Sequence, residues 1–105
     1  MGLDMSLKKI PRTVYNNISG DNFWFEQHNK SEEIVYWRKK YDIEVWFREN
    51  TVIDEECSNE ITKEKLEALV NWLEKEKLKE DAVKIKDVIK QTDFTNEVVF
   101  YKYSN

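Results

Sequence analysis

Glycine and proline are scarce in this chain, and their scarcity constrains the fold more than any other feature of the sequence. Only Gly2, Gly20 and Pro11 occur among 105 residues. Both residue types interrupt helices and strands, so a chain that nearly lacks them is expected to form long elements joined by a few polar turns. A chain of 105 residues suffices for one hydrophobic core. We therefore expect a single domain over residues 1–105, with the polar residues 1–7 disordered or left over from cloning.

Several segments resemble strands. Residues 8–17 contain Pro11, which is tolerated at a sheet edge, so this segment is a candidate edge strand. Residues 23–25, Phe-Trp-Phe, are expected to form a strand after the strongest turn signal of the chain, Ser-Gly-Asp-Asn at 19–22. Residues 97–103 are rich in valine and tyrosine and are expected to form the last strand.

Residues 32–40 and 42–48 are interpreted as a further pair of strands. The second segment alternates with a period of two, which places Ile43, Val45 and Phe47 on one face. The first segment is ambiguous, because some of its large residues also fall at helical spacing. Its content of β-branched and aromatic residues favours a strand.

Helical spacing begins after Thr62. The hydroxyl of Thr62 can accept a backbone N–H of the first turn, and Ile61 and Leu66 occupy the two positions of a hydrophobic staple. Apolar residues from Leu66 onwards follow the spacing i, i+3, i+4, i+7. The stripe changes phase near Leu78 and resumes after Asp81, so the segment is two helices or one bent helix. Because the last strand must return to the same sheet, the simplest fold is α+β, an antiparallel sheet of about four to five strands with two helices packed on one face, in the order β-β-β-α-α-β.

The aromatic residues suggest a binding surface. Side chains alternate faces along a strand, so one consistent assignment places several large rings on the sheet face opposite the helices. Contiguous exposed apolar patches tend to mark interaction sites, and Trp, Tyr and Arg are enriched at interfaces. Internal packing or self-association explains the same rings, and a slip of one residue reverses each face. The predicted binding residues are Trp24, Trp37, Lys39, Trp46, Arg48 and Tyr101.

Residues that carry catalysis are sparse. His28 is the only histidine and lies in an expected turn, and Cys57 lies among acidic residues that disfavour a reactive thiolate. A calcium loop starting at Asp54 fails, because Asn59 and Lys65 occupy the positions of the required glycine and glutamate. Two glycines cannot form a glycine-rich phosphate loop. We therefore expect a protein that is not an enzyme and has no cofactor and no metal site.

Charge and cysteine content narrow the partners and the compartment. A formal net charge of −4 and only three arginines disfavour nucleic acid as a partner. One cysteine cannot form an intramolecular disulfide, which fits a cytoplasmic setting, and no apolar run approaches the roughly 18 residues of a membrane span.

These observations predict a non-enzymatic protein-interaction domain that binds a partner protein, or a second copy, through an aromatic sheet face. The alternative is a single-stranded nucleic-acid-binding module that stacks bases on the same rings, since residues 36–41 interleave aromatic and basic side chains. In composition, the chain resembles toxin-immunity proteins and phage-encoded inhibitors of host defence. This resemblance covers no particular residues, and it implies an inhibitor or immunity-type role.

Overall fold

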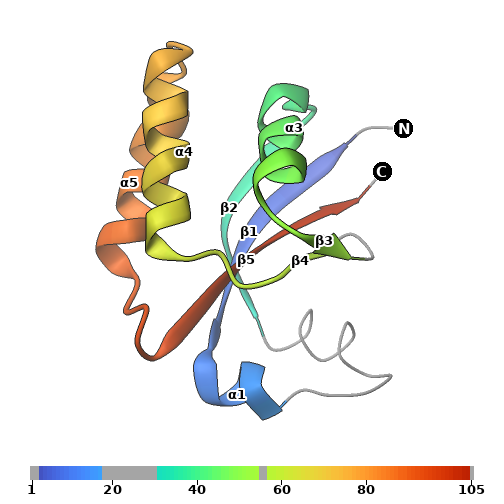
Figure 1. The fold of residues 1–105 in the computed structure, drawn as a ribbon, viewed down its shortest axis with the longest axis vertical. Coiled ribbons are helices and arrows are strands. Elements are labelled where there is room, and N and C mark those ends of the chain that lie inside the picture. The colour runs from blue at the N-terminus through green and yellow to red at the C-terminus, as the bar shows by residue number, and fades with distance from the viewer. Residues whose placement is uncertain (1–2, 18–30, 55–56, 105) are drawn as a thin grey trace.

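The computed structural model describes residues 3–17, 31–54 and 57–104, which form an α+β fold (Figure 1). In this part of the chain three long antiparallel strands make up the body of the sheet. The strand β1 (Asp4–Pro11) lies between β2 (Glu32–Arg38) and β5 (Glu97–Ser104). Two strands of two residues each, β4 (Cys57–Ser58) and β3 (Ile53–Asp54), extend the sheet beyond β5.

The hydrogen-bonded strand order is therefore β2-β1-β5-β4-β3. The expectation of about four to five strands was wrong for the body of the sheet, because only three of the described strands are longer than two residues. The described helices are α1 (Arg12–Asn17), α3 (Tyr41–Asn50), α4 (Lys63–Lys75) and α5 (Lys79–Gln91). With the two short strands left out, the order is β-α-β-α-α-α-β and not β-β-β-α-α-β. The expected strand at 23–25 and the turn at 19–22 lie outside the described residues.

The N-terminal prediction was wrong in two respects. Residues 4–7 form the first half of β1, although residues 1–7 were expected to be disordered, and Met5 and Leu7 are buried. The strand is also central and not an edge, and it ends at Pro11, where the chain turns into α1. Ionic and hydroxyl residues between the apolar ones give this segment a polar appearance, but their alternation is that of a strand.

Residues 42–48 are helical, which corrects the second strand of the expected pair. Ile43, Trp46 and Phe47 are buried at the spacing i, i+3, i+4, whereas Val45 is 47% exposed. Both period two and period 3.6 are present in this short segment, and tertiary packing selects the helix. The first member of the pair is confirmed as a strand, β2.

The two C-terminal helices and the last strand are confirmed. The hydroxyl of Thr62 accepts a hydrogen bond from the Lys65 amide at 3.3 Å and caps α4. The helix ends at Lys75 with Glu76 as its C-cap, and Lys77 follows with a φ of 64°. The Leu78 amide donates to the Leu73 carbonyl at 2.8 Å. Glycine usually occupies the left-handed position after a helix, but here that position is Lys77. The break between the two helices therefore has no glycine that would mark it in the sequence.

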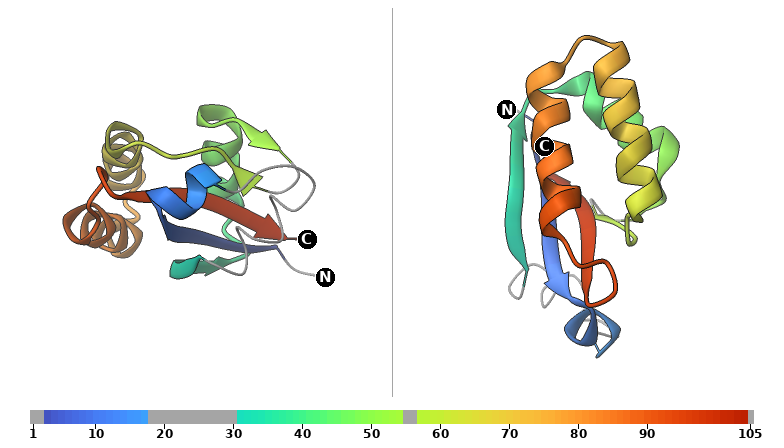
Figure 2. Two further views of the ribbon diagram at one scale, coloured as in Figure 1. Left: turned by 90° about the horizontal axis from the view of Figure 1, so that it is seen from below. Right: turned by 90° about the vertical axis from the view of Figure 1, so that its left-hand side faces the viewer.

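Both faces of β5 are buried along Val98–Tyr101. Val99 and Tyr101 of β5 belong to the main core, which the residues of α3, α4 and α5 complete. Val98 and Phe100 belong to a smaller cluster with Ile10, against which α1 packs. The prediction that Tyr101 lies on the face opposite the helices was therefore wrong. Figure 2 (right) shows α4 and α5 in front of the sheet, with β2 along the margin beside α5.

Candidate functional site

The rings predicted to form a binding face are buried in the core. Trp37, Trp46 and Tyr101 expose 2%, 8% and 0% of their surface. The face assignment failed because Trp46 lies on a helix, and because Trp37 and Tyr101 point toward the helices and not away from them. Trp24 lies outside the described residues. The three described rings are therefore not exposed on a face of the sheet.

A buried polar contact holds Trp37 in place. The indole Nε1–H donates to Oδ1 of Asp81 at 3.0 Å, and Lys40 Nζ lies 3.7 Å from Oδ2 of the same carboxylate. The Asp81 side chain is only 6% exposed, so it needs these partners to offset its desolvation. The contact joins β2 to the first turn of α5 and fixes the face of β2 that meets the helices.

The other aromatic residues form a stacked layer beneath α3. Phe47 stacks on Tyr101 with ring centroids 4.1 Å apart and planes 7° apart. Trp46 meets Phe47 edge to face at 5.3 Å. Offset-stacked and edge-to-face pairs are the arrangements that aromatic quadrupoles favour. The described aromatic residues that suggested an interface are thus mainly the packing of α3 on the sheet.

The two predicted cationic residues, Lys39 and Arg48, are both exposed, but they belong to different elements. Arg48 on α3 donates to both carboxylate oxygens of Glu44, at 2.9 and 3.2 Å, and its guanidinium lies 5.3 Å from the ring centre of Tyr103. Hydrogen bonding to Glu44, and then to Tyr103, raises the pKa of Arg48. Lys39 follows the end of β2 with a φ of 58°. Arg48 therefore braces α3 against β5, and Lys39 belongs to the β2 margin.

Metal-binding side chains do not cluster in the described part of the chain. Those residues contain no cluster of three or more His, Cys, Asp or Glu side chains that could hold a metal ion. His28 and the side chain of Cys57 lie outside the description. The Tyr101 hydroxyl is buried without a hydrogen-bond partner among described residues, and burial raises the pKa of Tyr101 far above its usual value. The side chain of Tyr101 is not exposed to solvent.

The margin of the sheet at β2 offers a different kind of site. The strand β2 is terminal in the strand order, and its pairing with β1 fixes the direction of its backbone groups. The Lys39 amide donates to the Leu3 carbonyl at 2.7 Å, so the backbone groups of alternate residues, 37 and 35, also face β1. The N–H and C=O groups of Tyr36 and Arg38 consequently point away from the sheet.

A bulge limits the regular part of this edge. Leu7 pairs with Val35 but Lys8 pairs with Glu33, so Ile34 is an additional residue in β2. A bulge bends its strand and interrupts the ladder, which protects an exposed edge from extended pairing. The regular outer edge is thus residues 36–38.

A groove runs between this edge and α5. It has a cavity volume of about 500 Å³. Ile34 and Val35 of β2 and Val88 of α5 supply its apolar part. Four charged residues also line it: Glu32, Glu33, Lys84 and Asp87. The end of the groove at the start of β2 is therefore acidic.

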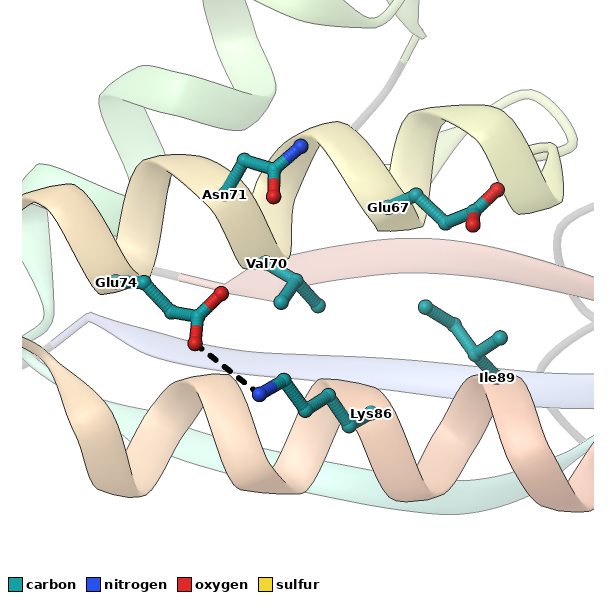
Figure 3. A pocket seen from close by; sticks show the side chains of 6 residues that line it. All are labelled: Glu67, Val70, Asn71, Glu74, Lys86 and Ile89. Carbon is teal, nitrogen blue, oxygen red and sulfur yellow. Dashed lines mark hydrogen bonds and ion pairs between the residues drawn. The ribbon is translucent and has the colours of Figure 1, made fainter.

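The groove between α4 and α5 is a weaker candidate. It has a cavity volume of about 350 Å³, and Glu74 reaches across it to Lys86 at 3.1 Å (Figure 3). Val70 and Ile89 point into the space between the two helices, to one side of this ion pair. The ion pair connects the two helices, so the groove is mainly the seam of a helix pair.

Known proteins give no guide to the site. No protein-family model, no curated protein and no solved structure matches this chain. No helix of residues 3–17, 31–54 and 57–104 has the length and apolar character needed to cross a membrane.

Sequence reasoning missed the β2 edge as a site, although part of its signal is visible in the sequence. Glu32 and Glu33 open the strand, and Arg38, Lys39 and Lys40 follow its end. The opposite charges at the two ends of the segment are therefore visible in the sequence. The position of the strand at the sheet margin is a property of the tertiary fold alone.

Proposed function

We propose that this chain is a non-enzymatic protein-interaction domain that accepts an extended segment along the outer edge of β2. The observation that carries the proposal is the position of β2 at the margin of the sheet, with the outward backbone groups of Tyr36 and Arg38 beside a groove. An added strand would pair with these groups at the usual spacing of roughly 4.8 Å. Such strand addition derives affinity from main-chain hydrogen bonds and specificity from pockets for alternate side chains.

The groove supplies those pockets on the helix side of the sheet. Alternate side chains of an added strand would point toward α5, where Val88 provides apolar contact. The remaining side chains would lie beside the exposed ring of Tyr36, whose hydroxyl donates to Asp4. A short segment of alternating apolar and polar residues fits this arrangement.

Charge restricts the segment further. Glu32, Glu33 and Asp87 outnumber Lys84 around the groove, so the end of the segment that meets the start of β2 should be basic. Binding of this kind is stoichiometric and needs no catalytic residues, which suits the inhibitor or immunity-type role suggested by composition.

Selection from a display library of random heptapeptides tests the proposal. We expect selected peptides to be extended, with lysine or arginine at one end. Tyr36→Pro should abolish peptide binding, because proline removes the N–H that points away from the sheet. The hydrogen bonds between β2 and β1 do not use this N–H and are kept. Tyr36→Phe keeps that N–H and is the matched control. Peptides that bind Tyr36→Pro as well as the wild-type protein would exclude strand addition at this edge.

A further inference from the structure

The edge strand is charged with opposite signs at its two ends. Glu32 and Glu33 stand at its start, and Arg38 and Lys39 at its end, and all four side chains are exposed. The ion pairs formed among the described residues do not include any of them. A ligand strand that carries one sign of charge throughout would meet charges of the same sign at one end of β2. A strand with an acidic start and a basic end, running antiparallel to β2, would meet charges of opposite sign at both ends.

We infer that the strand accepted at this edge is β2 of a second copy of the chain, paired antiparallel about a two-fold axis near Trp37. This inference rests on the proposed function, since it names the occupant of the same edge. A two-fold interface must be self-complementary, because each copy contributes the same surface. The sequence of β2 meets that condition: with Trp37 near the axis, Lys39 lies opposite Val35 of the other copy and diagonally next to its Glu33, and the reverse holds at the other end.

The hydrogen-bonding pattern places the axis. The regular outer edge comprises residues 36–38, and the outward backbone groups belong to Tyr36 and Arg38. Pairing Tyr36 of one copy with Arg38 of the other satisfies both residues in both copies, and Trp37 then lies opposite its counterpart. The bulge at Ile34 ends the regular pairing on each side.

Side chains support this register on the exposed face. Tyr36 is 49% exposed, which makes it one of the few large apolar side chains at the surface of the described residues. In the paired arrangement its ring lies beside the Arg38 guanidinium of the other copy, a favourable cation–π arrangement. Lys39 would approach the acidic start of the opposite strand.

The regular pairing segment is short, so the association should be weak. Interfaces below about 1,200 Å² belong to the transient class, and we expect a monomer–dimer equilibrium that depends on protein concentration. Because complementary charges contribute, raising the salt concentration from about 0.1 M to about 1 M should favour the monomer.

Sedimentation equilibrium with charge-exchanged variants tests the inference. One variant carries Glu32→Lys and Glu33→Lys, and the other carries Arg38→Glu and Lys39→Glu. Each variant alone should lose the dimer, because its edge carries one sign of charge throughout. An equimolar mixture should recover a dimer that contains one copy of each, which also shows that both variants are folded. Tyr36→Pro should be monomeric and Tyr36→Phe should dimerise.

The outcomes separate this inference from the proposed function. A wild-type protein that stays monomeric, or charge variants that dimerise as well as wild type, would overturn self-pairing. If the monomeric protein still selects peptides that Tyr36→Pro does not bind, only the identity of the occupant is wrong. If both dimerisation and Tyr36-dependent peptide binding are absent, the edge is not a binding site.

Discussion

Replacement of Trp37 by phenylalanine tests the packing that separates this structure from the sequence-based assignment. The substitution removes the hydrogen bond from Nε1 to Oδ1 of Asp81, which is 3.0 Å long and buried. A hydrogen bond to a charged group contributes about 1.5–3 kcal/mol. The smaller ring also gives up on the order of 40 Å² of buried area, or about 1 kcal/mol. We therefore expect Trp37→Phe to lower the free energy of unfolding by about 2.5–4 kcal/mol.

Urea unfolding followed by circular dichroism measures this change, provided that the variants share one m-value. Asp81→Ala and the double variant complete a thermodynamic cycle, in which we expect a coupling energy of about 1–2 kcal/mol. Tyr36→Phe, on the opposite face of β2, should cost less than Trp37→Phe. A cost below about 0.5 kcal/mol for Trp37→Phe, together with no coupling, is typical of a surface residue. That result would return Trp37 to the exposed face and refute the packing described above.

Three further predictions address single elements. Lys77→Gly should raise the free energy of unfolding by on the order of 1 kcal/mol, because Lys77 has a left-handed backbone that glycine adopts without strain. Lys84→Gly should lower the free energy of unfolding by about 1 kcal/mol, because Lys84 lies in the middle of α5, where glycine is unfavourable. Equilibrium denaturation measures the free energy of unfolding of both variants. Equal losses of stability in the two variants would contradict the left-handed backbone at Lys77 after α4. Phe47→Ala should lower the free energy of unfolding by about 3–5 kcal/mol, since Phe47 is fully buried. Val45→Ala on the same helix should change the free energy of unfolding by no more than about 0.5 kcal/mol. Similar losses in the two variants would argue for a strand at this position. Hydrogen bonds, first from the Asn96 side chain and then from the Thr95 amide, hold the pKa of Asp93 below its ordinary value. The Asp93 carboxylate therefore stabilises the fold above its unfolded pKa of about 3.9, and this contribution is lost as the pH falls through the lower folded pKa. Stability measured against pH should fall less steeply below pH about 4 in Asp93→Asn than in the wild type, and parallel curves would contradict this role.

Local signals in the sequence were enough for the C-terminal half. Thr62 caps α4, and the staple residues Ile61 and Leu66 are both buried. These signals depend on residues within one or two turns of each other, so they can be interpreted without knowledge of the fold. The strand β5 was predictable for a similar reason, since its valine and tyrosine content favours a strand on either face.

The N-terminal half and the candidate site depended on contacts between distant residues. Residues 42–48 fit both periods, and the packing of Phe47 on Tyr101 selects the helix. The face of β2 is set by the contact of Trp37 with Asp81, 44 residues away in sequence. Alternation along a strand shows that two faces exist, but which face is covered depends on elements elsewhere in the chain.

The sequence by itself determined that this chain forms an α+β fold whose C-terminal half is helical and begins at the cap Thr62, and it also contains the opposite charges at the ends of β2. Only the tertiary structure decided that the tryptophans described here on β2 and α3 lie in the core and that β2 lies at the sheet margin. The physical reason is that capping and periodicity depend on neighbours in the chain, whereas burial and edge position depend on which strands and helices pair across it.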